Sequence, residues 1–324
     1  MFKTRITEML GIEYPIICGG MQYVSNAELV AAVSQAGGMG MLAVGNFASK
    51  EELRDEIRKI KTLTDKPFGV NVTFMPVLEF VDREGMMDTA IEEGVSAFET
   101  SGRITEEHVQ RIKKGNAKHI HKVARVRDAR TAERLGVDAV AIVGFECGGI
   151  PPMDEITTFI QVPVVVGAVS VPVIAGGGIG DARSFVAALA LGAEGVVMGT
   201  RFMATKESLI HSNTKEAMIN AKETDTICVM RSLGIMERTL KTEASQKVVE
   251  MEKKGATLEE LIPLIMGKKV QEAFETGDLH MGILPCGQVT GLINEVPSVK
   301  EVIDDMVSGA GEILKRLSRM VVVG

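Results

Sequence analysis

The feature that most constrains the fold is an alternation of short apolar runs with amphipathic helical stretches along about the first 200 residues. The runs are rich in Val, Ile, Ala or Met and have the length of buried strands. They span residues 14–18, 39–44, 67–74, 95–100, 118–123, 137–143, 171–177 and 193–199. Helical stretches between them span 26–37, 50–63, 129–136 and 181–192. Eight such repeats predict an α/β protein of the TIM (β/α)8 barrel class.

A doubly wound sheet is the alternative fold for such a pattern. It normally has five to seven strands and one dominant phosphate loop, so eight runs favour the barrel. The first helix is expected to begin directly after Ser25, because Ser25 with Glu28 three residues later is the signature of a capping box.

The character of the chain changes after residue 204. Residues 206–284 are charged, helical in pattern and short of strand signals, and we interpret them as an added helical subdomain. Residues 1–205 and 285–324 then form the barrel, which a final helix at 298–320 completes. The subdomain also offers a surface for a homodimer.

Composition limits the class of partner. The 324 residues carry a net charge of −7 without a Lys/Arg cluster, which argues against nucleic acid. No apolar run approaches 18 residues and the first residues lack the apolar segment of a signal peptide, so we expect no membrane contact and a cytoplasmic location. The four cysteines are far apart with no CxxC pair, so we expect no metal site.

The strongest local signal is a pair of glycine-rich strand ends, AGGGIGDAR at 175–183 and MGTRF at 198–202. The loops after the last two strands of a TIM barrel often bind phosphate. Glycines there let backbone N–H groups approach an anion, and a threonine adds a hydroxyl. The alternative is two tight strand–helix turns that merely need glycine. The phosphate site would consist of Gly176, Gly177, Gly178, Gly199 and Thr200.

These glycines do not form a dinucleotide fingerprint. GGGIGD does not fit GxGxxG, and no acidic residue ends a following strand at the right distance. A GxxxxGK[ST] loop is also missing. One terminal phosphate, such as that of flavin mononucleotide (FMN), fits better than a nucleoside diphosphate.

Other strand ends present groups suited to a planar polar ring. Glycines would expose backbone, a methionine would offer an apolar surface and an amide would donate and accept hydrogen bonds. A lysine near the flavin pyrimidine edge would stabilise the anionic reduced ring. The alternatives are a turn asparagine and a solvated surface lysine. The residues concerned are Gly19, Gly20, Met21, Asn71, Lys122 and Gln288.

The histidines differ in what their positions suggest. His121 ends the fifth predicted strand, and His119 is expected to take a packing role on the opposite side of that strand. His108 belongs to a charged helical stretch and is expected to face solvent. His280 comes just before the GQ turn at 287–288, so we keep it as a candidate base at the barrel mouth.

A set of motifs in this order resembles the nitronate monooxygenase (2-nitropropane dioxygenase) family of FMN-dependent TIM barrels, which includes NADH:quinone reductases and FMN-type enoyl-acyl-carrier-protein reductases. The resemblance covers nearly the whole chain. It is carried by TRITEMLGIEYPIICGGMQYVS, LTDKPFGVNVTFMP, IHKVARVRDARTAERLGVDAVAIVGFECGG, VPVIAGGGIGDARSFVAALALGAEGVVMGTRFMATKES and GILPCGQVTGLI. The third stretch looks most like the quinone-reductase branch.

The resemblance implies non-covalent FMN. Glycines and a methionine would line the ring, an asparagine and a glutamine would lie beside it, and a lysine would sit near its pyrimidine edge. The expected cofactor site comprises Gly19, Gly20, Met21, Asn71, Lys122, Gly148, Gly176, Gly177, Gly178, Gly199, Thr200 and Gln288.

The loop GFECGGIPP at 144–152 departs from the family pattern. The family commonly has a histidine after the glycine pair, assigned as a base in nitronate oxidation, and Ile150 stands here instead. Isoleucine cannot move a proton, whereas hydride transfer from a nicotinamide to a flavin needs alignment and exclusion of water. Lys122, His280 and Ile150 are therefore the residues that we expect at the reaction centre, with Ile150 as an apolar wall.

Four functions follow from this resemblance. We expect first an FMN reductase that takes electrons from NADH or NADPH and passes them to small quinone-type acceptors. A nitronate monooxygenase that uses O₂, an enoyl-thioester reductase and a flavin-binding barrel without turnover are the alternatives.

Overall fold

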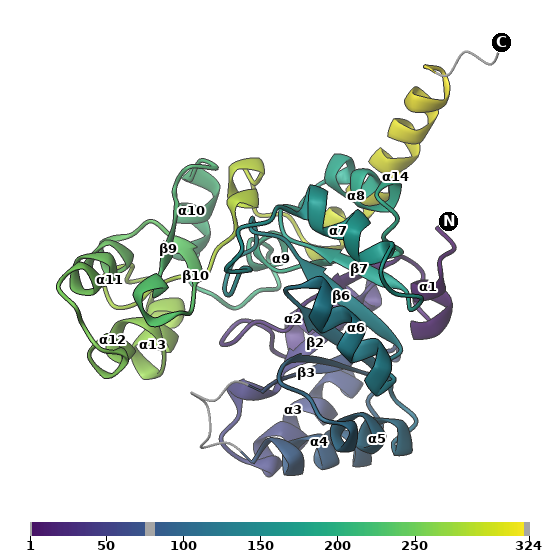
Figure 1. The fold of residues 1–324 in the computed structure, drawn as a ribbon, viewed down its shortest axis with the longest axis horizontal. Helices are drawn as coiled ribbons and strands as arrows, with labels where there is room; N and C mark the ends of the chain where they lie inside the picture. The colour runs from purple at the N-terminus through teal and green to yellow at the C-terminus, as the bar shows by residue number, and fades with distance from the viewer. Residues whose placement is uncertain (1, 75–81, 321–324) are drawn as a thin grey trace.

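The computed structural model describes residues 2–74 and 82–320. Eight parallel strands close into a barrel in the order β1 to β8, which confirms the predicted fold class (Figure 1). Each predicted run overlaps one strand. The strands are β1 (Ile16–Cys18), β2 (Met39–Ala43), β3 (Gly69–Phe74), β4 (Ala97–Gly102), β5 (Lys118–Val123), β6 (Ala139–Val143), β7 (Val173–Gly176) and β8 (Gly195–Met198).

The barrel closes because β1 pairs with both β2 and β8. Ile17 lies opposite Met39 on one side and Val197 on the other. Helices surround the strands (Figure 1). They are α2 (Ala27–Gln35), α3 (Lys50–Leu63), α4 (Arg83–Glu92), α5 (Glu106–Lys114), α6 (Val126–Leu135), α7 (Thr158–Val166), α8 (Ala182–Ala190) and α14 (Val299–Ser318).

The start of α2 differs from the prediction by one residue. Asn26, not Ser25, caps the helix, and its side chain accepts a hydrogen bond from Leu29 N. Asparagine and serine are equally good caps. The Ser25 hydroxyl instead accepts from Met21 N at 2.9 Å and donates to Gly19 O at 3.2 Å. Ser25 therefore shapes the loop after β1, which is part of the site described below.

The interior of the barrel is a separate apolar core. Met41, Ile120 and Ile174 from different strands pack together there. Helix α1 (Arg5–Leu10) adds Ile6 and Leu10 to the same cluster. Because α1 closes the end where the strands begin, only the carboxyl ends of the strands are left to form a site.

A second lobe, here called the cap, comprises residues 212–276 and lies to one side of the barrel (Figure 1). The predicted helices are present, but two antiparallel strands lie between them and were not predicted. Its elements are α10 (Ser212–Asn220), β9 (Thr226–Val229), β10 (Glu237–Leu240), α11 (Glu243–Lys253), α12 (Leu258–Ile265) and α13 (Lys268–Thr276). The boundaries 206–284 proposed for the whole subdomain stay a prediction.

The cap is fastened to the barrel by backbone and apolar contacts. Gly149 in the loop after β6 exchanges two backbone hydrogen bonds with Arg238 of β10, at 3.0 and 2.6 Å. Val270 and Phe274 of α13 belong to the same apolar cluster as the barrel and its outer helices. The cap is therefore joined to the barrel core through α13, while Val229, Val248 and Leu261 belong to a separate apolar cluster within the cap.

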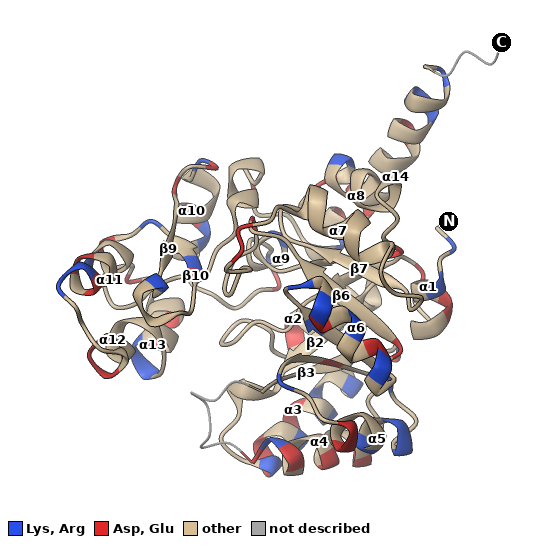
Figure 2. Ribbon diagram, viewed as in Figure 1, with Lys and Arg blue, Asp and Glu red and all other residues tan. Residues whose placement is uncertain are grey.

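Charges of both signs are interleaved on the outer helices α3, α4 and α5 (Figure 2). Glu93 accepts ion pairs from Arg54, Arg58 and Lys61, for example. Within the described residues, no helix has the length and apolar character needed to span a bilayer. The same part of the chain holds no group of three His, Cys, Asp or Glu arranged for a metal ion.

Candidate active site

A cavity of about 610 Å³ lies between the carboxyl ends of the barrel strands and the cap. Ligand sites commonly have volumes of roughly 300–1,000 Å³. Loops after most of the barrel strands contribute to it, as expected for a TIM barrel. On the other side, the cap and the segment that follows it contribute mainly apolar side chains, namely Ile265, Met266, Val270, Phe274, Pro285 and Val289.

A buried carboxylate organises the barrel mouth. Glu99 on β4 is only 1% exposed, and its Oε2 accepts from Asn71 Nδ2 at 2.5 Å. The Lys122 ammonium lies 3.8 Å from the same oxygen, and Gly20 N donates to it at 3.4 Å. Register explains the cluster, because Asn71 and Glu99 face each other across β3 and β4. Glu99 was not among the residues predicted for the site, although an acid within an apolar strand run is a signal for it.

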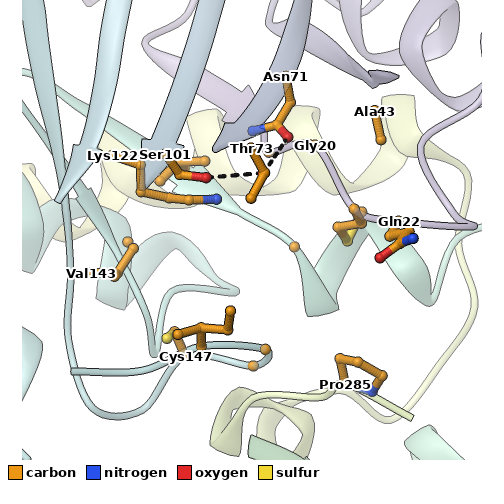
Figure 3. A pocket seen from close by; sticks show the side chains of 18 of the residues that line it. Gly20, Gln22, Ala43, Asn71, Thr73, Ser101, Lys122, Val143, Cys147 and Pro285 are labelled. Carbon is orange, nitrogen blue, oxygen red and sulfur yellow. Dashed lines mark hydrogen bonds between the residues drawn. The ribbon is translucent and has the colours of Figure 1, made fainter. Parts of the chain in front are cut away.

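Two hydroxyl groups extend this network toward the cavity (Figure 3). Thr73 Oγ1 donates to Asn71 Oδ1 at 3.2 Å, and Ser101 Oγ donates to Thr73 Oγ1 at 3.0 Å. Figure 3 shows Lys122 reaching into the same space from β5, with Cys147 and Pro285 on the other side. Both ends of the Asn71 amide are engaged, so its orientation is fixed by the protein.

Gly20, in the loop after β1, has no room for a larger side chain. A Cβ added to Gly20 would lie 2.1 Å from Asn71 Cβ, which is far inside contact distance. At Gly199 an added Cβ would lie 3.2 Å from Met21 Sδ. Small residues therefore keep this side of the cavity open and bring backbone to its surface.

The loops after β7 and β8 present free backbone donors. Within the described residues, the N–H groups of Gly178, Ile179, Gly199 and Thr200 have no acceptor. All four residues line the cavity. Gly178 has φ +72°, a left-handed conformation that favours glycine. Four unpaired donors on two adjacent loops are a cradle suited to an anion.

Besides its N–H group, Thr200 contributes its side-chain hydroxyl. Its Oγ1 accepts from Gly287 N at 2.9 Å and so ties the segment after the cap to the end of β8. The same side chain also forms a hydrogen bond with the Cys286 thiol. Thr200 thus serves the cradle and the packing around it.

The loop at 144–152 is held rather than free. The Glu146 carboxylate accepts from Thr158 N at 2.9 Å and from the Thr158 hydroxyl at 3.1 Å. Its carbonyl accepts from Gln288 N. Burial raises the pKa of the Cys147 thiol to about 12, so the thiol is not a thiolate near neutral pH. Glu146 and Cys147 therefore shape the loop and do not supply an acid or a nucleophile.

Two histidines on β5 share one hydroxyl. Thr100 Oγ1 lies 2.7 Å from His119 Nε2 and 2.8 Å from His121 Nδ1. The prediction that they face opposite sides is wrong, because residues two apart on a strand share a face. Burial, with smaller effects of neighbouring charges, lowers the pKa of His119 to about 3 and of His121 to about 4. Both rings are neutral at pH 7, and His121 lines the cavity.

Several predicted residues come together here. Gly19, Gly20, Met21, Asn71, Lys122, Gly148, Ile150, Gly176, Gly177, Gly178, Gly199 and Thr200 all line the cavity. Ile150 is 47% exposed, as an apolar wall residue would be.

Two predicted site residues, His280 and Gln288, are not among the described residues that line the cavity. The His280 side chain is 67% exposed and bonds Glu243 at 2.8 Å, in a shallow depression on the cap away from the main cavity. Its N–H is bound to Asp278 in a turn that ends before the chain returns to the barrel. Gln288 is not among the described lining residues, whereas its neighbours Gly287 and Val289 are.

His108 is buried rather than solvent-facing. It is 8% exposed, it caps α5 together with Thr105, and its ring stacks on Phe74 at 4.3 Å. The charged residues around it cover the outer face of the helix, while the third helical position turns inward.

The same residues can be compared with known proteins. Residues 3–309 match the family model described as nitronate monooxygenase. The chain belongs to the nitronate monooxygenase family. It is therefore an oxidoreductase. The members of this family, and the structurally similar protein FabK described below, are FMN-dependent flavoenzymes. The predicted family is confirmed.

Relatives in this family carry different names. A (3aS,4S,5R,7aS)-5-hydroxy-7a-methyl-1-oxo-octahydro-1H-indene-4-carboxyl-CoA dehydrogenase of Mycobacterium tuberculosis is 31% identical, covering 98% of this chain and 99% of the relative. A probable nitronate monooxygenase of Staphylococcus aureus is 33% identical over 77% of this chain and 81% of its own. FabK from Thermotoga maritima is 37% identical with a TM-score of 0.92, covering 99% of this chain and all of that structure.

Proposed function

We propose that this protein is a reductase that uses FMN and NADH or NADPH to reduce a conjugated carbonyl acceptor, either an enoyl thioester or a quinone. The two-sided cavity carries the proposal. Its barrel side is polar and rich in backbone donors, and its cap side is apolar. A flavin suits the first side and an acyl chain or quinone ring suits the second.

The cavity residues fit FMN. The free N–H groups of Gly178, Ile179, Gly199 and Thr200 would hold the phosphate. Lys122 would lie near the pyrimidine edge, where its positive charge stabilises a reduced, anionic ring. When bound, FMN supplies two-electron transfer between the nicotinamide and the acceptor.

The remaining groups position and shield. Glu99 and Asn71 hold Lys122 in place, because the ammonium and the amide share one carboxylate oxygen. Ile150, Met266 and Phe274 exclude water from the reacting atoms. We place thioesters before quinones, since the relative from M. tuberculosis is named for a carboxyl-CoA compound and matches nearly the whole chain.

The test begins with the purified protein under argon. Its visible spectrum should contain a flavin band that bleaches on addition of NADH or NADPH. The reduced protein is then mixed with an enoyl-CoA, a quinone or an alkyl nitronate, and the return of the band is timed. Rapid return with the enoyl-CoA is the expected result.

Other outcomes would overturn the proposal or narrow the class of acceptor. A flavin band that neither nicotinamide bleaches, together with oxygen uptake in the presence of nitronates, would establish nitronate oxidation instead. Return of the band with quinones alone would exclude thioesters as acceptors and leave the reductase proposal standing. A cytoplasmic location and a homodimer stay predictions, which cell fractionation and light scattering would test.

A further inference from the structure

One acidic side chain in the cavity has no partner. Glu237 is the first residue of β10 and lines the cavity from the cap side. No hydrogen bond or ion pair to another described residue involves its carboxyl group. Burial alone raises the pKa of this carboxyl to about 7. A carboxyl group in this state holds a proton at neutral pH and can also release it.

Its position is fixed by backbone pairing on two sides. Glu237 pairs with Val229 of β9, and the next residue, Arg238, exchanges two backbone hydrogen bonds with Gly149 in an isolated bridge, so Glu237 and Ile150 both lie next to this bridge. Both side chains line the cavity. Arg238 faces the other way, where its guanidinium donates to Phe145 O and Thr226 Oγ1. The alternation along the strand therefore turns Glu237 toward the cavity and Arg238 away from it.

No charge on the neighbouring elements compensates Glu237. On β9, Cys228 lies opposite Arg238, not opposite Glu237. Arg231, between β9 and β10, is held by Glu155 of the loop after β6. Lys122 is held by Glu99 in the barrel mouth.

Each of the other titratable groups that line the described cavity is either paired with another residue or has a pKa that burial shifts away from neutrality. Burial raises the pKa values of the Tyr23 hydroxyl and the Cys147 thiol, and His121 is neutral with a pKa of about 4. The Glu146 carboxylate is bound to Thr158, and Asp128 pairs with Arg127 at 3.6 Å.

The cavity's remaining basic groups are also unsuited to giving up a proton. Arg83 keeps its positive charge at any pH that a protein tolerates. The Lys122 ammonium lies 3.8 Å from the Glu99 carboxylate, which holds it in the barrel mouth.

We propose that Glu237 is the proton donor to the acceptor that binds under the cap. The proposal rests on the proposed function. Reduction of an enoyl thioester adds a hydride to the β-carbon and a proton to the α-carbon, and the carbon–carbon double bond becomes single. Bound FMN, once reduced by NADH or NADPH, would supply the hydride and with it the two electrons. The proton leaves the Glu237 carboxyl group, which regains one from water.

The test compares the holoprotein with its Glu237→Gln variant in two separate half-reactions. Bleaching of the flavin by the nicotinamide should be unchanged, because hydride transfer to the flavin needs no acid. Reoxidation by an enoyl-CoA should be slower by about 100-fold, the usual contribution of a general acid. In the native protein this second rate should fall as pH rises through about 7, and in Glu237→Gln that dependence should vanish.

A second readout does not depend on turnover. The intensity of the infrared carboxylic-acid band of the resting holoprotein should fall by the equivalent of one carboxyl group as pH rises through about 7. Glu237→Gln should lack this change. The change should persist in Glu243→Gln, a control that alters an exposed acid of the cap outside the cavity. Glu237→Asp, which keeps an acid, should recover part of the reoxidation rate and guards against a folding defect in the amide variant.

The two proposals fail in different ways. Failure of both nicotinamides to bleach the flavin would overturn the reductase, while the infrared titration would still report on Glu237. Normal bleaching with an unchanged reoxidation rate and pH profile in Glu237→Gln would overturn the proton-donor role alone. An infrared change that survives in Glu237→Gln would do the same.

Discussion

Glu99 is a buried carboxylate at the mouth of the barrel, and the positions of Asn71 and Lys122 depend on it. Without Glu99 the Lys122 ammonium would have no ion-pair partner among the described residues. Removing one partner of a buried pair leaves an uncompensated charge, which is costly. The chemistry of the mouth therefore depends on a residue that does not itself line the cavity.

Gly20→Ala should destabilise the protein by about 1–3 kcal/mol, the usual cost of overpacking. The added methyl group would lie 2.1 Å from Asn71 Cβ and push it away from Glu99. Chemical denaturation would measure the loss. Gly45→Ala is the control, because Gly45 also lines the cavity and an added Cβ there meets nothing within 4 Å. Equal stability of the two variants would contradict the steric argument.

Lys122→Met should slow flavin reduction by about tenfold, which corresponds to about 1.4 kcal/mol of lost transition-state stabilisation. The reason is the loss of the positive charge nearest to the proposed ring edge. Anaerobic stopped-flow mixing with NADH or NADPH would measure the rate. Lys122→Arg keeps the charge and should retain most of it. A methionine variant with the native rate would remove Lys122 from the mechanism.

At the level of elements, two loops supply the anion cradle, and a backbone bridge together with α13 joins the cap to the barrel. The loops follow β7 and β8, where barrel geometry brings adjacent strand ends together. The isolated bridge between Gly149 of the loop after β6 and Arg238 of β10 then places Ile150 and Glu237 next to it on the cavity wall. The cavity lies where the cap packs over the carboxyl ends of the barrel strands.

Gly178→Val should weaken FMN binding by at least about tenfold. A valine there is strained at φ +72° and displaces the N–H groups of the cradle. Fluorescence titration of apoprotein with FMN would measure the affinity. Gly234→Val is a matched control, since Gly234 has φ +73° but lies in the cap outside the cavity lining. If both variants lose FMN equally, backbone strain rather than the cradle is the cause.

For the whole molecule, the free energy of unfolding depends on pH through three groups whose pKa values are shifted by burial, namely His119, His121 and Glu237. His119 and His121 have lowered pKa values, so the unfolded chain binds protons that the folded one does not. Their stabilising contribution is complete above about pH 6.5 and is lost as pH falls toward 4. Glu237 acts in the opposite direction, because its raised pKa makes stability fall as pH rises from 4.5 through about 7.

His119→Gln should therefore reduce the loss of Tm between pH 6.5 and 4, by removing one group that must otherwise stay neutral. Thermal unfolding across this range would measure it. His280→Gln should keep the native dependence, since His280 is exposed. An acid-induced loss of the same size in His119→Gln would show that other groups cause it.

The sequence by itself determined the barrel, because most of its buried parallel strands are short apolar runs that alternate with helical stretches. It also determined the glycine positions, since backbone close to a ligand or at positive φ requires glycine. The roles of Glu99, Glu237 and His280 were decided only by tertiary structure. Glu99 depends on register between strands, and Glu237 depends on an isolated backbone bridge joining residues 149 and 238. His280 lies near the GQ turn in sequence but on the outer side of the cap, because a turn separates the two.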